Sequence, residues 1–181
     1  MMMTDLSSAT EMETTPTELE PIDLSRASIL LVDDNQQNLE LMQAYLEELT
    51  CHLRTARDGV EAVEAIQEEC PDLVLLDVMM PRMSGFEVCQ KIKSSDATRD
   101  VVVIMVTALH EVGDFERAVD CGTNDFITKP INKLELLTRV KSLLELRLVK
   151  KQFDHLLELR RRARPDVRNL PETDETDQER A

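Results

Sequence analysis

The sequence predicts an α/β fold: a (βα)5 doubly wound parallel sheet with strand order 2-1-3-4-5 and an extended C-terminal helix. Unbroken apolar runs at 29–32, 73–76 and 101–106 are typical of strands buried on both faces. Segments with helical spacing of apolar residues alternate with these runs, which indicates a parallel sheet with helices on both faces. Polar clusters follow the first and third strands. In a sheet of order 2-1-3-4-5 these two strands are neighbours and the chain changes direction across the sheet between them, which is where ligands bind, so the clusters favour this strand order.

Each strand of the predicted sheet is followed by a helix, and turn residues mark the boundaries. The strands are expected at about 28–32, 51–56, 73–77, 101–106 and 125–128. Asn35 supplies N-cap chemistry for the first helix, and Pro71 follows the end of the second. A fourth helix is expected at 111–120, where Gly122 suits the C′ position, and the last helix begins near Asn132.

The negative charge lies mainly at the two ends of the chain. The 181 residues include 36 Asp and Glu against 21 Lys and Arg, a net charge of −15, and 42% are hydrophobic. Residues 1–25 hold six acids and no base, and residues 165–181 hold six acids and two arginines. Such segments bury too little apolar surface to order themselves, so we expect a disordered acidic tail at each end. The folded body is expected at 26–148, and 149–164 extend its last helix as a coiled-coil candidate.

The composition also argues against several settings. No apolar run approaches the ~20 residues of a membrane span, and the first residues lack the pattern of a signal peptide. The region between the tails is itself acidic, which disfavours nonspecific binding of nucleic acid. Cys51, Cys70, Cys89 and Cys121 show no metal-binding spacing, so we expect reduced thiols, mostly in the core. We therefore expect a cytoplasmic protein that binds neither membrane nor nucleic acid.

Polar residues end several predicted strands at the same edge of the sheet. Asp33 and Asp34 follow the first strand and Asp77 ends the third, so these neighbouring strands bring the three acids together. Crowded carboxylates repel one another, and a hard divalent cation such as Mg²⁺ relieves that repulsion. Thr107 and Lys129 end the fourth and fifth strands and face the same crevice. This set of groups suits a phosphoryl group on Asp77, whose carboxylate would be the nucleophile.

Four pieces of the sequence resemble the receiver domains of two-component response regulators. They read LVDDN at 31–35, LLDVMMP at 75–81 with Ser84-Gly85 after it, VTA at 106–108 and FITKP at 126–130. Each piece is weak alone, but the four in this order and with family-like spacing are specific. The resemblance covers about 26–148 of the chain.

The resemblance implies a metal site and an acceptor residue. Asp77 would be the phosphoacceptor, and Asp33 and Asp34 would hold Mg²⁺ together with it. The backbone carbonyl of Met79 would be a further ligand of the metal ion.

The resemblance also implies how the domain would signal. Thr107 and Lys129 would contact the phosphoryl group, and Thr107 and Phe126 would form a switch pair. Simple core packing is the alternative interpretation of Phe126. The bond between Lys129 and Pro130 is usually cis in this family. The phosphoryl donor would be a histidine kinase or a histidine phosphotransfer protein, and the output an unknown downstream protein.

The amino-acid sequences of these motifs are most similar to those of receivers that precede diguanylate cyclase (GGDEF) modules. Because this chain has no room for such a module, we expect a single-domain receiver that is not an enzyme. One alternative is an aspartate-nucleophile phosphatase, but such enzymes need a second acid two residues after the nucleophile, where this chain has Met79. Another is a pseudo-receiver that binds partners without phosphorylation, against which the acidic set, Thr107 and Lys129 argue.

The last helix continues beyond the expected end of a receiver. Its apolar residues are spaced 3, 3, 4, 3 and 3 apart: Leu143, Leu146, Val149, Phe153, Leu156 and Leu159. This spacing predicts a short coiled-coil seam and a homodimer, and the alternative is a helix that folds back on its own domain. The arginines at 160–162 and Arg164 could bind nucleic acid. The favoured interpretation is that they stabilise the negative C-terminal end of the helix and pair with the acidic tails.

Two apolar side chains bear on the lifetime of an aspartyl phosphate. In receivers, the side chains two positions after the phosphoacceptor and two after the threonine border the path of the attacking water. These are Met79 and Leu109 here, and neither can orient a water molecule. We therefore expect slow hydrolysis.

Overall fold

The computed structural model describes residues 21–108 and 119–163. Residues 21–151 belong to one compact unit, called the body here, and residues 152–163 belong to another. Leu109 and most of the helix expected at 111–120 lie outside the described residues, as do most of the predicted N-terminal tail and all of the C-terminal one. The predicted boundaries of the receiver region, at 26 and 148, remain predictions.

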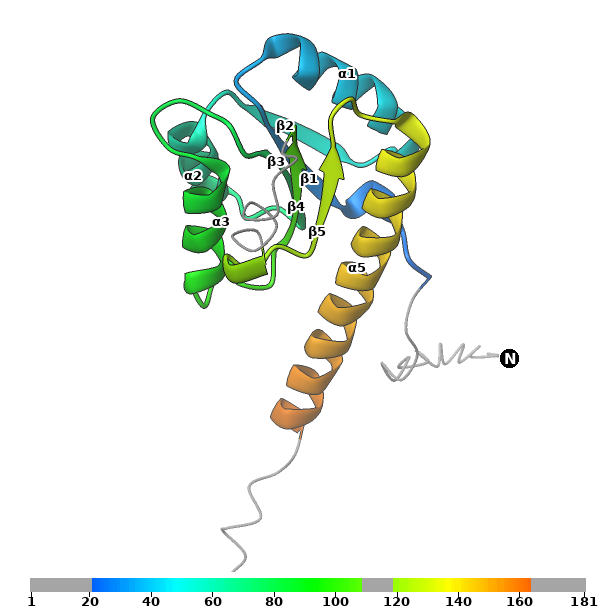
Figure 1. The fold of residues 1–181 in the computed structure, drawn as a ribbon. Helices are drawn as coiled ribbons and strands as arrows, with labels where there is room; N and C mark the ends of the chain where they lie inside the picture. The colour runs from blue at the N-terminus through cyan, green and yellow to red at the C-terminus, as the bar shows by residue number, and fades with distance from the viewer. Residues whose placement is uncertain (1–20, 109–118, 164–181) are drawn as a thin grey trace, which may run out of the picture. The chain divides into compact units, whose positions relative to one another are not determined.

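A five-stranded parallel sheet forms the centre of the body (Figure 1). Its strands lie in the order β2-β1-β3-β4-β5, which confirms the predicted fold class and strand order. The strands are β1 Ser28–Val32, β2 His52–Ala56, β3 Leu73–Asp77, β4 Val102–Thr107 and β5 Asp125–Thr128. The central strands β1, β3 and β4 are buried almost throughout, whereas the edge strands β2 and β5 are partly exposed. The unbroken apolar runs of β1, β3 and β4 are therefore explained by helices that cover both faces of the sheet.

Side chains cap the first turns of several helices, and the cap of α1 is the Asn35 that the sequence indicated. The helical elements are η1 Leu24–Arg26, α1 Gln36–Leu46, η2 Glu47–Leu49, α2 Gly59–Glu68, α3 Gly85–Ser94 and α5 Lys133–Ala163. Asn35 accepts from the N–H of Gln37 at the start of α1. Ser84 and Glu87 form a capping box at the start of α3, which satisfies N–H groups that the helix itself leaves unpaired.

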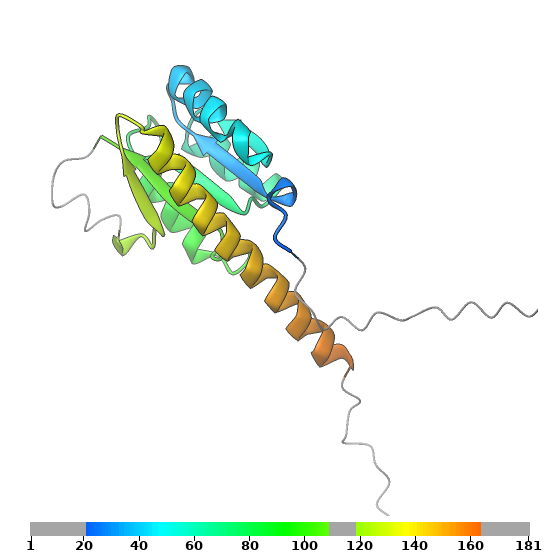
Figure 2. The same ribbon diagram turned by 90° about the vertical axis from the view of Figure 1, so that its right-hand side faces the viewer.

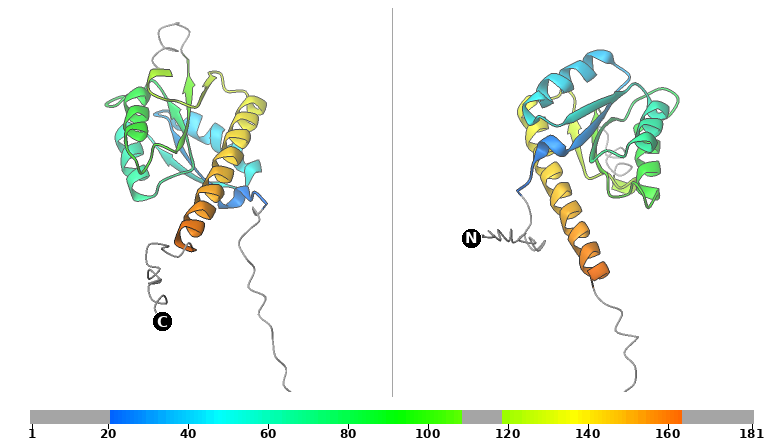
Figure 3. Two further views of the ribbon diagram at one scale, coloured as in Figure 1. Left: turned by 90° about the horizontal axis from the view of Figure 1, so that it is seen from below. Right: turned by 180° about the vertical axis from the view of Figure 1, so that it is seen from behind.

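The helices cover the sheet as two layers (Figures 1 and 2). On one face, α1 and the first turns of α5 bury Leu39, Met42 and Val140 against the sheet. On the other face, α2 and α3 bury residues such as Ile66 and Val88. The views from below and from behind show the same arrangement (Figure 3). The carboxyl ends of the strands stay at one edge between these layers, where ligands of such sheets bind.

Three smaller expectations from the sequence can be compared with the structure. Strand β4 runs one residue further than expected, to Thr107, because Thr107 pairs with Thr128 of β5. Cys89 is buried in the core, Cys51 and Cys121 are partly buried and pack against it, and only Cys70, in the connection after α2, is exposed. Among the described residues, no helix is both long enough and apolar enough to cross a bilayer.

Candidate functional site

Three carboxylates meet at the carboxyl end of the sheet. Asp33 directly follows β1 and Asp77 is the last residue of β3, and these strands pair with Val32 opposite Leu76. Asp33, Asp34 and Asp77 each offer one oxygen, and these oxygens lie within 4.8 Å of one another. Asp33 and Asp77 are buried whereas Asp34 is exposed, so the cluster has one open side. The structure thus brings together the three acids that the sequence analysis singled out.

Lys129, directly after β5, supplies the counter-charge of this cluster. Its Nζ donates to Asp33 Oδ2 at 2.9 Å and to Asp77 Oδ1 at 3.0 Å. Its backbone N–H donates to the carbonyl of Thr107 at 2.7 Å, which ties the end of β5 to the end of β4. The peptide bond between Lys129 and Pro130 is cis, as the resemblance implied. The ammonium group is therefore held between two buried carboxylates from two different strands.

Asp33 is fully buried, and both of its oxygens accept hydrogen bonds. The backbone N–H of Asn35 donates to Oδ1 at 2.9 Å, and Lys129 donates to Oδ2. The side-chain amide of Asn38 donates to both oxygens at 3.0 Å. The sequence analysis missed Asn38, although an amide in the first turn of a helix that starts beside a buried carboxylate is a usable signal. Asn38 holds the orientation of the Asp33 carboxylate.

Burial and mutual repulsion make the negative charge of Asp77 costly. Burial raises the pKa of Asp77 above its ordinary value, the Lys129 ammonium opposes this, and the charges of Asp33 and Asp34 add to it. Burial also lowers the pKa of Lys129, but the hydrogen bonds and charges of Asp33 and Asp77 outweigh burial, so that pKa lies above its ordinary value. The lysine therefore stays charged, and the three acids retain an excess of negative charge that a cation would balance.

The loop after β3 packs directly on the backbone of Asp77. A Cβ atom added at Gly85 would lie 2.2 Å from the carbonyl oxygen of Asp77, so only glycine fits there. The N–H of Gly85 donates to the carbonyl of Val78 at 3.0 Å. Arg82 has a left-handed backbone, with φ of 68°, and its guanidinium pairs with Asp58, the N-cap of α2. These contacts hold the loop, and with it the backbone at the end of β3, in one place.

The remaining predicted site residues are Thr107, Phe126, Met79 and Leu109. Thr107 is buried at the end of β4. Phe126 pairs with Met105 in the β4–β5 register, and it is 37% exposed, which does not fit simple core packing. The side chain of Met79 is 67% exposed. Leu109, which the sequence analysis placed beside the same site, lies outside the described residues.

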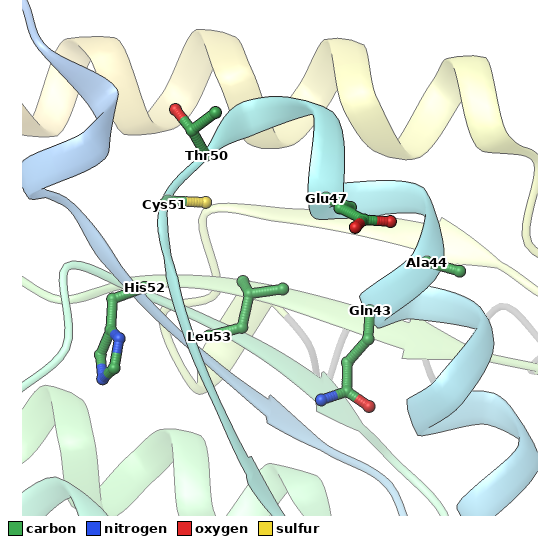
Figure 4. A pocket seen from close by; sticks show the side chains of 7 residues that line it. All are labelled: Gln43, Ala44, Glu47, Thr50, Cys51, His52 and Leu53. Atoms are coloured by element: carbon green, nitrogen blue, oxygen red, sulfur yellow. The ribbon is translucent and has the colours of Figure 1, made fainter.

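A separate surface hollow lies between α1, η2 and the start of β2 (Figure 4). The side chains of Gln43, Glu47 and His52 are among those that line it. None of the three clustered aspartates lines this hollow. Among the described residues, a cluster of three carboxylates in contact with a lysine ammonium lies instead at the carboxyl end of the sheet.

The comparisons with known proteins agree with this geometry. A family model described as the response regulator receiver domain matches residues 29–141. The response regulator PleD of Caulobacter vibrioides is 43% identical over 123 residues, which are 68% of this chain and 27% of PleD. The chain likewise spans no more than 50% of the length of the other curated relatives compared.

Solved structures with the same fold include other receiver domains. The signal receiver domain of a histidine kinase from Syntrophus aciditrophicus is 37% identical, with a TM-score of 0.62, and the match covers 65% of this chain and 89% of that one. The BeF3-activated receiver domain of DrrB, a Thermotoga maritima protein, is 33% identical, with a TM-score of 0.61. That match covers 66% of this chain and 98% of the DrrB domain.

Proposed function

The chain belongs to the response regulator receiver domain family, and from that premise we propose that its body is a phosphorylation-dependent signalling domain. Asp77 accepts a phosphoryl group from a histidine kinase or a histidine phosphotransfer protein. The phosphorylated domain then changes its binding to a downstream protein. The observation that carries the proposal is the position of Asp77, a buried carboxylate at a strand end that contacts Lys129 and lies beside Asp33 and Asp34.

The donor set of the site fits Mg²⁺. Three carboxylate oxygens within 4.8 Å of one another suit a hard divalent cation, and the exposed side at Asp34 leaves room for the waters that Mg²⁺ retains. Asp33, Asp34, Asp77 and the backbone carbonyl of Met79 would hold the ion. When bound, Mg²⁺ balances negative charge on the phosphoryl oxygens.

The side chains of the site divide the work of phosphoryl transfer. Lys129 donates to Asp77 Oδ1, which leaves Oδ2 as the oxygen that attacks phosphorus. The new bond joins Oδ2 to phosphorus while the bond from phosphorus to the donor histidine nitrogen breaks. The Lys129 ammonium and the Thr107 hydroxyl then bind phosphoryl oxygens, so both groups stabilise the charge that is transferred.

The switch is proposed to join Thr107 to Phe126. Thr107 is buried at the end of β4, the strand that pairs with β3, and this burial supports a role for its hydroxyl in sensing a new group on Asp77. Phe126 lies on the edge strand β5 and is partly exposed, so a partner protein can contact it. A change at Thr107 can therefore reach a surface that a downstream protein binds.

The alternatives fit the site less well. A phosphatase that uses an aspartate nucleophile needs an acid two residues later, and Met79 occupies that position with an exposed thioether. A pseudo-receiver that only binds partners has no use for a partly buried lysine held between two buried carboxylates, because such charges are costly to desolvate. We therefore propose a signalling domain that undergoes phosphorylation and does not turn over a substrate.

The test is Mg²⁺-dependent labelling by acetyl phosphate, a small phosphoryl donor. Wild-type protein should take up label with Mg²⁺ and lose it when EDTA removes the metal ion. Asp77→Asn should abolish labelling, whereas the matched control Asp72→Asn, a buried carboxylate at the other end of β3, should leave labelling intact. Equal labelling of the Asp77→Asn protein and wild type would contradict the proposal.

A further inference from the structure

Two thiols from distant parts of the chain meet on the face of the sheet that α2 and α3 cover. Cys89 lies in α3 and is fully buried, and Cys121 lies in the turn before β5 and is half-buried. Cys89 Sγ donates to the carbonyl oxygen of Cys121 at 3.3 Å, so this turn packs directly on α3 (Figure 1). Burial raises the pKa of the Cys89 thiol well above its ordinary value, and a hydrogen bond with the Cys121 side chain adds to the rise. The two side chains are therefore in direct contact.

Lys93, one turn further along α3, adds a positive charge to the thiol pair. Its Nζ donates to the neutral carbonyl oxygen of Val101 at 2.7 Å. A Cβ atom added at Gly122 would lie 3.3 Å from Lys93 Cγ, so the lysine stem packs against the residue that follows Cys121. Burial lowers the pKa of Lys93, whereas the negative charge of an ionised Cys89 or Cys121 raises it. The ammonium group thus favours the thiolate, which is the reactive form of cysteine.

This environment distinguishes the pair from ordinary core cysteines. A lone buried cysteine behaves as a small apolar side chain, and its thiol is inert. Cys51 packs against the core on the other face of the sheet, and Cys70 is exposed in the connection after α2. Cys89 and Cys121 instead share one cluster, in which two sulfur atoms and an ammonium group lie together.

We propose that Cys89 and Cys121 are a redox-active dithiol, which hydrogen peroxide converts to a disulfide that ties α3 to the turn before β5. Disulfides of this kind in reducing compartments are transient and sense oxidants. The two residues are 32 positions apart in the sequence, so the bond closes a long loop and restricts the unfolded chain.

The exposure of the two thiols assigns their order of reaction. Cys121 is half-buried and meets the oxidant first, whereas Cys89 is fully buried. The Cys121 thiolate attacks one peroxide oxygen, the O–O bond breaks, and the departing hydroxide takes up a proton to become water. Cys89 sulfur then attacks the sulfur of the resulting sulfenic acid. The S–S bond forms, the S–O bond breaks, and the departing hydroxide and the Cys89 proton form a second water.

The disulfide restricts the segment that enters β5. The Thr123 hydroxyl donates to the carbonyl oxygen of Val103 at 3.0 Å, so the turn is already attached to β4. A bond from Cys121 to α3 adds a second attachment, close to the strand that carries Phe126. An effect of oxidation on the switch between Thr107 and Phe126 rests on the proposed function, whereas formation of the disulfide does not.

Peptide mapping of the full chain tests the disulfide. Cys51→Ala with Cys70→Ser leaves only the two proposed thiols. This protein is treated with hydrogen peroxide, its remaining thiols are blocked with N-ethylmaleimide, and it is digested with trypsin without reductant. Peptides 83–91 and 118–133 should be joined, and dithiothreitol should separate them. The oxidised protein should also melt about 5 °C or more above the reduced one.

Variants of α3 test the role of the ammonium group. Lys93→Met keeps the apolar stem but removes the charge, and it should slow disulfide formation about tenfold. Lys93→Arg keeps the charge and should restore most of the rate. The matched control Lys91→Met changes an exposed lysine of the same helix and should leave the rate unchanged. A Lys93→Met protein that is oxidised at the unaltered rate overturns the role of Lys93.

Two outcomes overturn the dithiol itself. One is that peptides 83–91 and 118–133 stay unjoined at peroxide doses that oxidise Cys70 of the wild-type protein. The other is that the link runs between two chains, which a non-reducing gel shows as a dimer. Asp77→Asn should form the disulfide at the wild-type rate, so a failure of the redox proposal is distinguishable from a failure of the phosphorylation proposal.

Discussion

At the scale of single residues, the buried charge of Asp77 links the chemistry of the site to the stability of the fold. Folding raises the pKa of Asp77 above its ordinary value of 3.8, mainly through burial. A raised pKa means that the ionised form is disfavoured in the folded state. Ionised Asp77 therefore costs stability at neutral pH, and this cost disappears as the pH falls below the ordinary value, where the group is protonated in both states.

Asp77→Asn should accordingly stabilise the metal-free protein at pH 7, by about 1 kcal/mol, because it removes that buried charge. The gain should shrink as the pH falls towards the ordinary pKa of 3.8, because Asp77 then becomes protonated in both states. Urea denaturation in EDTA at a series of pH values measures it. Asp72→Asn is the control, since the Asp72 carboxylate is paired with Lys151 and should yield no such gain. A metal-free Asp77→Asn protein less stable than wild type at pH 7 would rule out the electrostatic explanation.

Asn38→Ala should weaken Mg²⁺ binding and stability indirectly, through the Asp33 carboxylate that Asn38 contacts. It removes the amide that donates to both oxygens of the buried Asp33 carboxylate. The free energy of unfolding should fall by about 1–3 kcal/mol, and Mg²⁺ affinity should fall as the Asp33 carboxylate loses its fixed orientation. Thermal melting and Mg²⁺ titration measure the two effects. The control Gln37→Ala changes the exposed residue next to Asn38 and should alter neither quantity. If the two variants behave alike, Asn38 does not support the Asp33 carboxylate.

Met79→Asn should shorten the lifetime of the phosphorylated protein. The exposed thioether offers no strong donor or acceptor to an attacking water, whereas an amide does. One added water-orienting hydrogen bond corresponds to roughly tenfold faster decay. The measurement is the loss of label after the donor is removed, with Met79→Leu as the control. If Met79→Asn and Met79→Leu decay at the same rate, this side chain does not control hydrolysis.

At the scale of elements, the loop between β3 and α3 depends on the absence of a side chain at Gly85. Gly85→Ala should lower the free energy of unfolding by about 3 kcal/mol or more, because the new Cβ would collide with the Asp77 carbonyl. Ser84→Ala removes only the cap of α3 and should cost about 1 kcal/mol. Denaturant melts compare the two variants. A Gly85→Ala protein as stable as Ser84→Ala would mean that the loop relaxes away from Asp77.

The strands and helix starts were predictable because local chemistry determines them. Long apolar runs placed β1, β3 and β4, and Asn35 caps α1 where the sequence indicated the start of a helix. Thr107, the last residue of β4, belongs to the strand because it pairs with Thr128 of β5. The sequence of one strand alone does not reveal this tertiary contact. The pairing of Arg82 with Asp58 depends likewise on the folded loop, since 24 positions separate the two residues.

At the scale of the whole molecule, parallel strand order is what assembles the site. Asp33, Asp77 and Lys129 come from three separate strand ends, and the order β2-β1-β3-β4-β5 brings them to one edge. The sequence analysis identified these residues because each follows a recognisable strand. It missed Asn38, whose role depends on how α1 packs beside Asp33, and it did not foresee that Cys70 is exposed, which depends on where the connection after α2 lies.

The most direct measurement is to identify the residue that carries the phosphoryl group. Protein treated with acetyl phosphate and Mg²⁺ is reduced with borohydride, which converts an aspartyl phosphate to homoserine, and its peptides are sequenced by mass spectrometry. Homoserine should appear at position 77, in the segment 73–81 at the end of β3, and should be absent when EDTA replaces Mg²⁺. Homoserine at any other position, or none at all in protein that remains folded, would contradict the assignment of Asp77 as the phosphoacceptor.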